Sequence, residues 1–105
     1  MSKTDALRIV DAAEVLAAGY PALVDALRQG HRGPRPSIDR SYIEHGADSF
    51  LVLPAWLPGR GFGVKMVTIL PGNEQRAGRP SVQAAYQLFD GVSGAPAAVI
   101  DGTAL

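Results

Sequence analysis

The spacing of hydrophobic and polar residues near the start of the chain predicts two short helices. Asp11 can cap the first helix, because its carboxylate accepts hydrogen bonds from free amides and Glu14 follows three residues later. Gly19 tolerates the left-handed conformation that ends many helices. Pro21 suits the first turn of a second helix, which we expect to end at Gly30. The apolar face of this helix comprises Leu23, Val24 and Leu27.

From Arg32 onward the sequence has a pattern typical of strands. The prolines at 34 and 36 cannot continue a helix, and a residue before proline favours extended backbone. Turns rich in glycine, proline and aspartate separate the segments that predict strands. These segments are residues 37–43, 50–53 (ending before Pro54), 63–70, 81–89 and 95–100, and we expect 71–80 to be a polar loop.

Helices followed by a run of strands predict an α+β fold. We expect one domain over residues 1–105, with the two short N-terminal helices packed on a mostly antiparallel sheet of about four to six strands. A chain of this length is sufficient for one hydrophobic core.

Composition narrows the classes of partner. Ten basic and ten acidic side chains cancel, so the chain lacks the field that attracts nucleic acids or anionic membranes. Cysteine is absent and only two histidines are present, so we predict neither disulfides nor a metal site. No apolar run approaches the roughly 20 residues of a membrane span, and no signal-like segment opens the chain, so we expect a cytoplasmic protein.

Lys65 is the most unusual residue of the predicted strands, because it interrupts an apolar segment. A period of two places its side chain on the same face as Gly63, Val67 and Ile69. Two interpretations remain open: this face is partly solvated, or the ammonium is held against an anionic or carbonyl group in a pocket. Gly61 and Gly63 favour the pocket a little, since missing side chains let a ligand approach closely. The alternative for these glycines is a simple bulge.

Arg35 lies between two prolines, and such a stiffened segment loses less entropy when a guanidinium binds a carboxylate. An arginine in a proline-rich loop is more often a solvent-facing charge, and spacing alone does not choose between the two. The sequence contains no Gly-x-Gly-x-x-Gly turn, no P-loop and no Gly-x-Ser-x-Gly elbow. Motifs alone therefore do not indicate which reaction the protein catalyses.

Several segments nevertheless occur in a specific order along the chain. Among them are Pro34-Arg35, Leu53-Pro54-Ala55-Trp56, Gly63-Val64-Lys65-Met66-Val67, Pro71-Gly72-Asn73 and Asp101-Gly102-Thr103. This order resembles the amino-terminal third of the ornithine cyclodeaminase/mu-crystallin family, and the resemblance covers nearly the whole chain.

In that family, this portion is similar to an α+β domain that builds the dimer and one wall of a cleft, and a Rossmann domain that binds NAD or NADP follows. The resemblance implies that Lys65 is catalytic and that Lys65 and Arg35 bind the substrate. It also implies that Ser81 and Gln83 approach the cofactor, although Val82 stands where the family often has a histidine. The implied partners are a second copy, in a homodimer, and a small amino-acid or imine substrate.

The chain itself lacks a glycine-rich phosphate turn and the family's downstream catalytic aspartate. We therefore expect it to hold no dinucleotide tightly alone, and to be part of an NAD(P)-dependent enzyme of the ornithine cyclodeaminase, alanine dehydrogenase or ketimine reductase type. Lyase and reductase chemistry both stay open. The alternative is a non-catalytic, crystallin-like binding or dimerisation module. Sequence beyond Leu105 that continues into a Gly-x-Gly turn would favour the enzyme.

Overall fold

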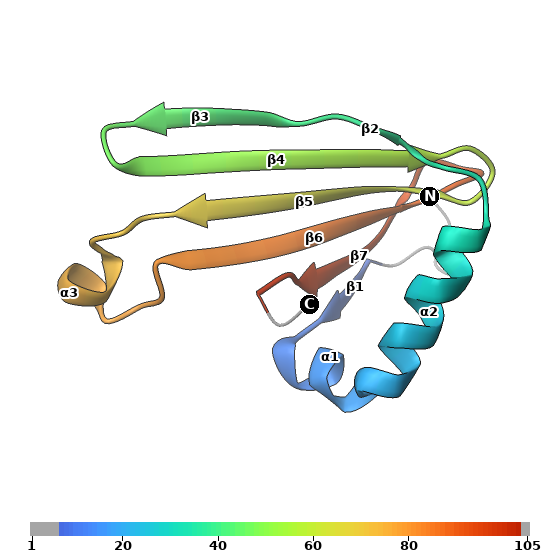
Figure 1. Cartoon of the computed structure of the whole chain (residues 1–105), viewed down its shortest axis with the longest axis horizontal. Helices are drawn as coiled ribbons and strands as arrows, with labels where there is room; N and C mark the ends of the chain where they lie inside the picture. Colours follow the sequence, from blue (N-terminus) through green and yellow to red (C-terminus); the bar gives the residue numbers. More distant parts are fainter. Residues whose placement is uncertain (1–6, 104–105) are drawn as a thin grey trace.

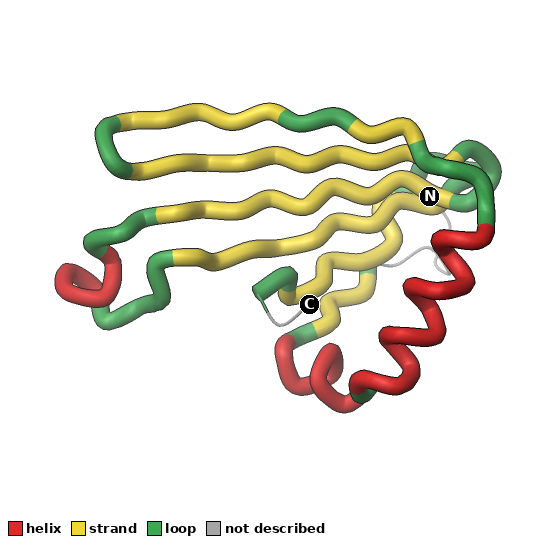
Figure 2. The backbone as a smooth tube through the Cα atoms, viewed as in Figure 1, coloured by secondary structure: helices red, strands yellow, loops and turns green. Residues whose placement is uncertain are grey.

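The computed structural model describes residues 7–103. In chain order the elements are β1 (Arg8–Val10), α1 (Ala12–Ala18), α2 (Tyr20–Arg32), β2 (Ser37–Ile38), β3 (Ser41–His45), β4 (Asp48–Leu57), β5 (Gly61–Ile69), α3 (Asn73–Ala77), β6 (Val82–Asp90) and β7 (Pro96–Asp101). Figure 1 shows β3, β4, β5 and β6 running side by side, with α1 and α2 near β1 and β7. Helix α3 lies beyond the far ends of β5 and β6, outside the sheet (Figure 2).

The strands within residues 7–103 form one seven-stranded sheet in the order β1-β7-β6-β5-β4-β2, and β3 also pairs with β4. Strand β1 runs parallel to β7, and the other pairs are antiparallel. The predicted α+β fold with a mostly antiparallel sheet is confirmed. The sheet has more strands than the expected four to six, because the apolar run at 8–10 joins β7 as an edge strand and the segment 37–43 divides into β2 and β3.

Strand β4 continues through Pro54, so the prediction that this strand ends there is wrong. Pro54 lies beside the interruption between β2 and β3, where the amide of Asp39 donates to the Pro54 carbonyl at 3.1 Å. In an antiparallel strand the N–H and C=O of one residue point to the same side. The amide that Pro54 lacks would therefore point toward this interruption, and the ladder between β4 and β5 is undisturbed.

The first helix begins and ends as predicted. Asp11 accepts a hydrogen bond from the Glu14 amide at 2.9 Å, and Gly19 follows the helix with a φ of 77°. The prediction that the second helix ends at Gly30 is wrong, because α2 continues to Arg32. Gly30 inside the helix costs only about 1 kcal/mol relative to alanine. Pro34 disfavours helical backbone at the preceding residue, Gly33, and therefore sets the C-terminal end of α2.

The stretch 71–80, which we expected to be a loop, contains the five-residue helix α3. The Asn73 side-chain amide donates to the Pro80 carbonyl at 3.0 Å, and the amide of Gly78 binds the carbonyls of Asn73 and Glu74. These hydrogen bonds are local, and the segment is polar. The sequence therefore shows no hydrophobic period that would have predicted α3. None of the helices in the described part of the chain is long and apolar enough to span a membrane.

Helix α1 packs against β7, and Val15 and Ala98 are buried there. Ile9 projects from the other face of the sheet and is 73% exposed, so α1 covers the face that carries Ala98. The apolar stripe of α2 is less covered, since Val24 is 39% and Leu27 62% exposed. Large parts of both sheet faces therefore lie free of helices.

Candidate functional site

The strand register places Lys65 between Leu53 of β4 and Tyr86 of β6. Residues two apart in a strand share a face, so the prediction that Lys65 and Gly63 project together is confirmed. We call this side of the sheet the Lys65 face. It comprises Leu53, Ala55, Gly63, Lys65, Val67, Ala84, Tyr86 and Leu88.

Lys65 is half-buried in β5. The ion pair that the structure shows within residues 7–103 joins Arg8 and Glu14 at 3.2 Å, and no hydrogen bond or ion pair in that range holds the Lys65 ammonium. The ammonium is not sealed from solvent. A half-buried cation that has no partner in the described part of the chain, on an otherwise apolar face, is suited to bind an anionic ligand.

A depression of about 300 Å³ lies on the Lys65 face. Gly63, Tyr86 and Leu88 contribute to its lining from the sheet, and Pro36 contributes from the loop between α2 and β2. Arg35 precedes Pro36, and Lys65 lies two residues from Gly63 on the same face. The fold therefore brings the loop that holds Arg35 and the strand that holds Lys65 toward one depression, but the charged residue that lines it is Arg60, and neither Arg35 nor Lys65 is part of the lining.

The ring of Tyr86 lies over Gly63. A Cβ atom at residue 63 would meet the Tyr86 hydroxyl and would lie 2.7 Å from Cζ of the ring, which is closer than real Cβ contacts. The register of β5 with β4 and with β6 is continuous through Gly61 and Gly63, so these glycines do not form a bulge. Glycine at 63 instead lets an aromatic ring rest on the strand.

Tyr86 is a site residue that the sequence does not single out. A tyrosine in an alternating apolar strand is typical of a core face, and its position beside Lys65 follows only from the register between β5 and β6.

Ser81 and Gln83 lie apart from Lys65 and Arg35. Ser81 precedes β6, and its hydroxyl donates to the Pro71 carbonyl at 3.4 Å. Gln83 pairs with Thr68, so its side chain leaves β6 on the face opposite Lys65. The structure places Pro36, the neighbour of Arg35, at the depression on the Lys65 face, and it places Gln83 on the opposite face.

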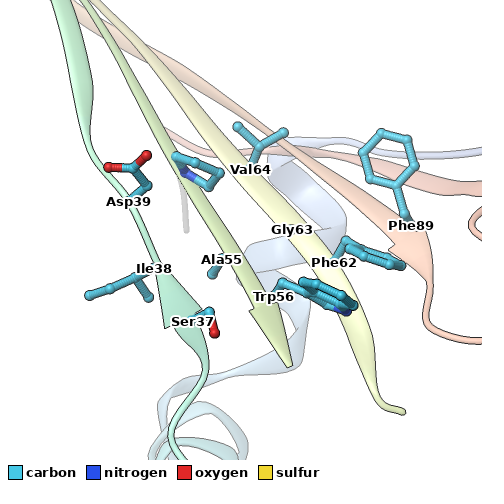
Figure 3. Close-up of a pocket in the computed structure, with 10 residues that line it drawn as sticks. Ser37, Ile38, Asp39, Ala55, Trp56, Phe62, Gly63, Val64 and Phe89 are labelled. Carbon is cyan, nitrogen blue, oxygen red and sulfur yellow. The ribbon is translucent and has the colours of Figure 1, made fainter. Parts of the chain in front are cut away.

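The opposite side, which we call the Trp56 face, carries an apolar groove of about 300 Å³ (Figure 3). The face comprises Pro54, Trp56, Phe62, Val64, Gln83 and Phe89. The rings of Trp56 and Phe62 stack with centroids 5.1 Å apart and planes 17° apart. Figure 3 shows the two rings next to each other. None of the four predicted site residues lines this groove.

Titratable groups elsewhere in residues 7–103 form no comparable site. No three His, Cys, Asp or Glu side chains in that range gather closely enough to hold a metal ion. In the turn between β6 and β7, Asp90 accepts hydrogen bonds from the Ser93 amide (2.7 Å), the Ser93 hydroxyl (2.9 Å) and the Val92 amide (3.1 Å). These bonds, the Ser93 amide above all, lower the pKa of Asp90. The Asp90 carboxylate therefore stabilises the turn between β6 and β7.

A sequence model of the ornithine cyclodeaminase/mu-crystallin family matches residues 4–105. The chain belongs to this family. The Delta(1)-pyrroline-2-carboxylate reductase of Paracoccus denitrificans is 37% identical over 78 residues, which are 74% of this chain and 24% of the reductase. An uncharacterised protein of Schizosaccharomyces pombe is 40% identical over 55 residues, which are 52% of this chain and 16% of that protein.

Several solved structures also share the fold of this chain. A lysine cyclodeaminase, described for its recognition of L-lysine, L-ornithine and L-2,4-diaminobutyric acid, gives a TM-score of 0.75 at 25% identity, over 91% of this chain and 33% of its own. An archaeal alanine dehydrogenase dimer with bound NAD gives 0.74 at 27% identity, over 92% and 31%. The Thermococcus litoralis Delta(1)-pyrroline-2-carboxylate reductase, in complex with NADH and L-proline, shares the fold with a TM-score of 0.77 at 24% identity, over 91% and 32%.

The chain thus spans about a quarter of the length of the curated reductase and about a third of each solved structure. The family and the partial coverage expected from the sequence are both confirmed.

Proposed function

We propose that this chain is the substrate-binding and dimer-forming portion of an NAD(P)-dependent enzyme that acts on an amino acid or a cyclic imine. The observation that carries the proposal is Lys65, a half-buried cation that has no partner within residues 7–103. It lies on the same sheet face as a depression that Pro36, the residue after Arg35, helps to line. Similarity to a pyrroline-carboxylate reductase and to lysine cyclodeaminase supports a substrate that carries both a carboxylate and a nitrogen.

In this proposal Lys65 and Arg35 bind the substrate carboxylate from two elements. A guanidinium presents two parallel donors that match a carboxylate, while an ammonium is a compact charge that can approach from the strand. Holding the carboxylate from two sides fixes the orientation of the carbon that carries the nitrogen, which is the reacting centre of both lyase and reductase chemistry. Lys65 is the catalytic residue in this scheme, because it contacts the substrate from within the sheet.

We propose NAD or NADP as the cofactor, since two of the similar structures hold NADH or NAD. The cofactor would supply hydride transfer when it is bound. Of the two residues that the resemblance implies for it, the Ser81 hydroxyl can hydrogen-bond polar cofactor atoms, whereas Gln83 leaves the sheet on the face opposite Lys65, so we do not assign Gln83 to a cofactor that reacts with a substrate held by Lys65. Residues 7–103 contain no glycine-rich phosphate turn, so the fit is limited to such side contacts.

We propose a homodimer in which the Trp56 face meets a second copy. Trp56 is 48%, Phe50 39% and Ile43 57% exposed, and the register places all three on this face. Exposed apolar patches beyond a few hundred Å² are rare on soluble monomers, because burying them against a partner is favourable. The similar alanine dehydrogenase is described as a dimer.

The substrate site is tested by binding, which depends on residues of this chain. We expect L-proline to shift the backbone amide NMR signals of Gly63 and Lys65 in a saturable manner, and pyrrolidine, which lacks the carboxylate, to leave them in place. Lys65→Met or Arg35→Met should weaken L-proline binding about tenfold or more, because each removes a charged hydrogen-bond donor. Arg28→Met, on the exposed surface of α2, is the matched control and should bind as the parent does. Equal response to pyrrolidine and L-proline would contradict the proposal.

A further inference from the structure

Tyr86 is the direct cross-strand neighbour of Lys65. Side chains opposite each other in an antiparallel pair have Cβ atoms about 5 Å apart. The Tyr86 ring does not stand upright beside the lysine but leans over Gly63, where it reaches the strand backbone. Any ligand whose carboxylate is held by Lys65 therefore has the phenol of Tyr86 as its nearest aromatic neighbour.

The hydroxyl of Tyr86 has no hydrogen-bond partner among residues 7–103. The side chain is half-buried and lines the depression on the Lys65 face, which is mostly apolar. A tyrosine whose ring is packed while its hydroxyl has no partner in the described part of the chain presents a polar group to the depression, which Arg60 also lines. This group can donate or accept one hydrogen bond to a ligand in the depression.

We propose that Tyr86 determines the specificity of this site for small cyclic amino acids and imines, by hydrogen-bonding a polar atom of the ligand and by limiting the size of its carbon skeleton. The inference rests on the proposed function, because it takes the ligand carboxylate to be held by Lys65 and Arg35. The ring occupies the space over Gly63, so a ligand beside Lys65 meets a fixed aromatic wall. A five-membered ring then fits more easily than a larger one.

The hydrogen bond is tested with Tyr86→Phe, which removes the hydroxyl and keeps the ring. L-Proline is titrated into the chain while the amide signals of Gly63 and Lys65 are followed by NMR. We expect Tyr86→Phe to bind L-proline about fivefold more weakly, the effect of one neutral hydrogen bond. Tyr42→Phe is the control, because Tyr42 is 58% exposed on β3 and does not line the depression. It should bind as the parent does.

The size limit is tested with Tyr86→Ala and two probes, L-proline and its six-membered homologue L-pipecolate. We expect the ratio of L-pipecolate affinity to L-proline affinity to rise about fivefold in Tyr86→Ala, because the aromatic ring that limits the size of the ligand is removed. A merely structural role of Tyr86 would weaken both probes together and leave this ratio unchanged.

The outcomes separate the inference from the proposed function. If Lys65→Met weakens L-proline binding while Tyr86→Phe and Tyr86→Ala leave affinity and ratio as in the parent, the role of Tyr86 is wrong and the carboxylate site stands. If L-proline shifts no signal on the Lys65 face of the parent chain, both the proposed function and this inference are wrong.

Discussion

The ring of Tyr86 occupies the space in which residue 63 would carry a side chain, and this contact sets the shape of the Lys65 face. Neither residue is strained, since glycine accepts any extended backbone and the tyrosine packs on the strand below it. The contact holds the phenol over Gly63, on the face that also carries Lys65. A side chain introduced at residue 63 should therefore displace the Tyr86 ring.

Gly63→Ala is expected to destabilise the fold by about 1–3 kcal/mol, because the new methyl group overlaps the Tyr86 ring and forces it aside. Urea denaturation would measure the change in the free energy of unfolding. Tyr86→Ala in the same chain should remove most of the cost, since the obstructing ring is then absent.

The matched control for this prediction is Gly30→Ala, because a Cβ at Gly30 meets nothing within 4 Å. Gly30 lies inside α2, where alanine is favoured over glycine by about 1 kcal/mol, so this variant should be more stable than the parent. Equal effects of the two substitutions would show that Tyr86 does not occupy the space above residue 63.

At this scale the sequence predicts which residues share a face but not what they touch. The period of two places Gly63 and Lys65 together. That a tyrosine covers the glycine depends on the register of β6 against β5, which hydrophobic alternation alone leaves open by two residues in either direction.

Whether an element could be predicted depends on whether its signal lies in its own segment or in a neighbouring strand. The Asp11 cap could be predicted, because a carboxylate followed three residues later by glutamate is a local signal. Helix α3 and strand β1 could not, since α3 has no apolar period and β1 is a strand only because β7 lies beside it. Pro54 was misleading for the same reason: its missing amide matters only if a neighbouring strand needs it.

The turn between β6 and β7 should depend on pH through Asp90. The folded chain lowers the pKa of this carboxyl below its ordinary value of about 3.9, so the charged group stabilises the fold above about pH 4 and this contribution is lost as pH falls through the lowered pKa. Asp90→Asn lacks the charge. The difference in free energy of unfolding between the parent and Asp90→Asn should therefore shrink as pH falls below about 4.

Urea denaturation at several pH values measures this difference. Asp25→Asn, on the exposed surface of α2, corrects for the loss of one negative charge, so the effect of the turn is what remains between the two variants. A difference that stays constant across the acidic range would contradict the assignment of the hydrogen bonds from Ser93 and Val92.

The whole molecule is a sheet with two large, partly uncovered faces that differ in chemistry. One face carries Lys65 and the depression near the Arg35 loop, and the other carries the stacked Trp56 and Phe62 rings. Composition and strand pattern could predict one α+β sheet, and the resemblance implied that Lys65 and Arg35 bind the substrate, which stays a prediction. The assignment of faces could not be predicted, because it depends on the register between β5 and β6, which places Gln83 on the face opposite Lys65.

The chain is expected to associate through the Trp56 face at micromolar concentration. Trp56→Ser should shift the sedimentation of the chain toward the monomer, because the largest exposed ring of this face is lost. Leu16→Ser is the control, since Leu16 is 70% exposed on α1 and lies outside this face. Circular dichroism would verify that both variants are folded. A sharp, concentration-independent monomer peak for the parent chain in analytical ultracentrifugation would rule out the interface.

The central claim is that Lys65 binds the carboxylate of an amino-acid or imine substrate, and the lysine signals themselves test it most directly. The sequence contains one other lysine, Lys3, which serves as an internal reference. With the lysine Cε atoms labelled with ¹³C, addition of L-proline should move the Lys65 signal along a saturable curve and leave the Lys3 signal in place. If both signals move equally, or if Lys65 does not move while L-proline is added to excess, Lys65 is not the carboxylate ligand.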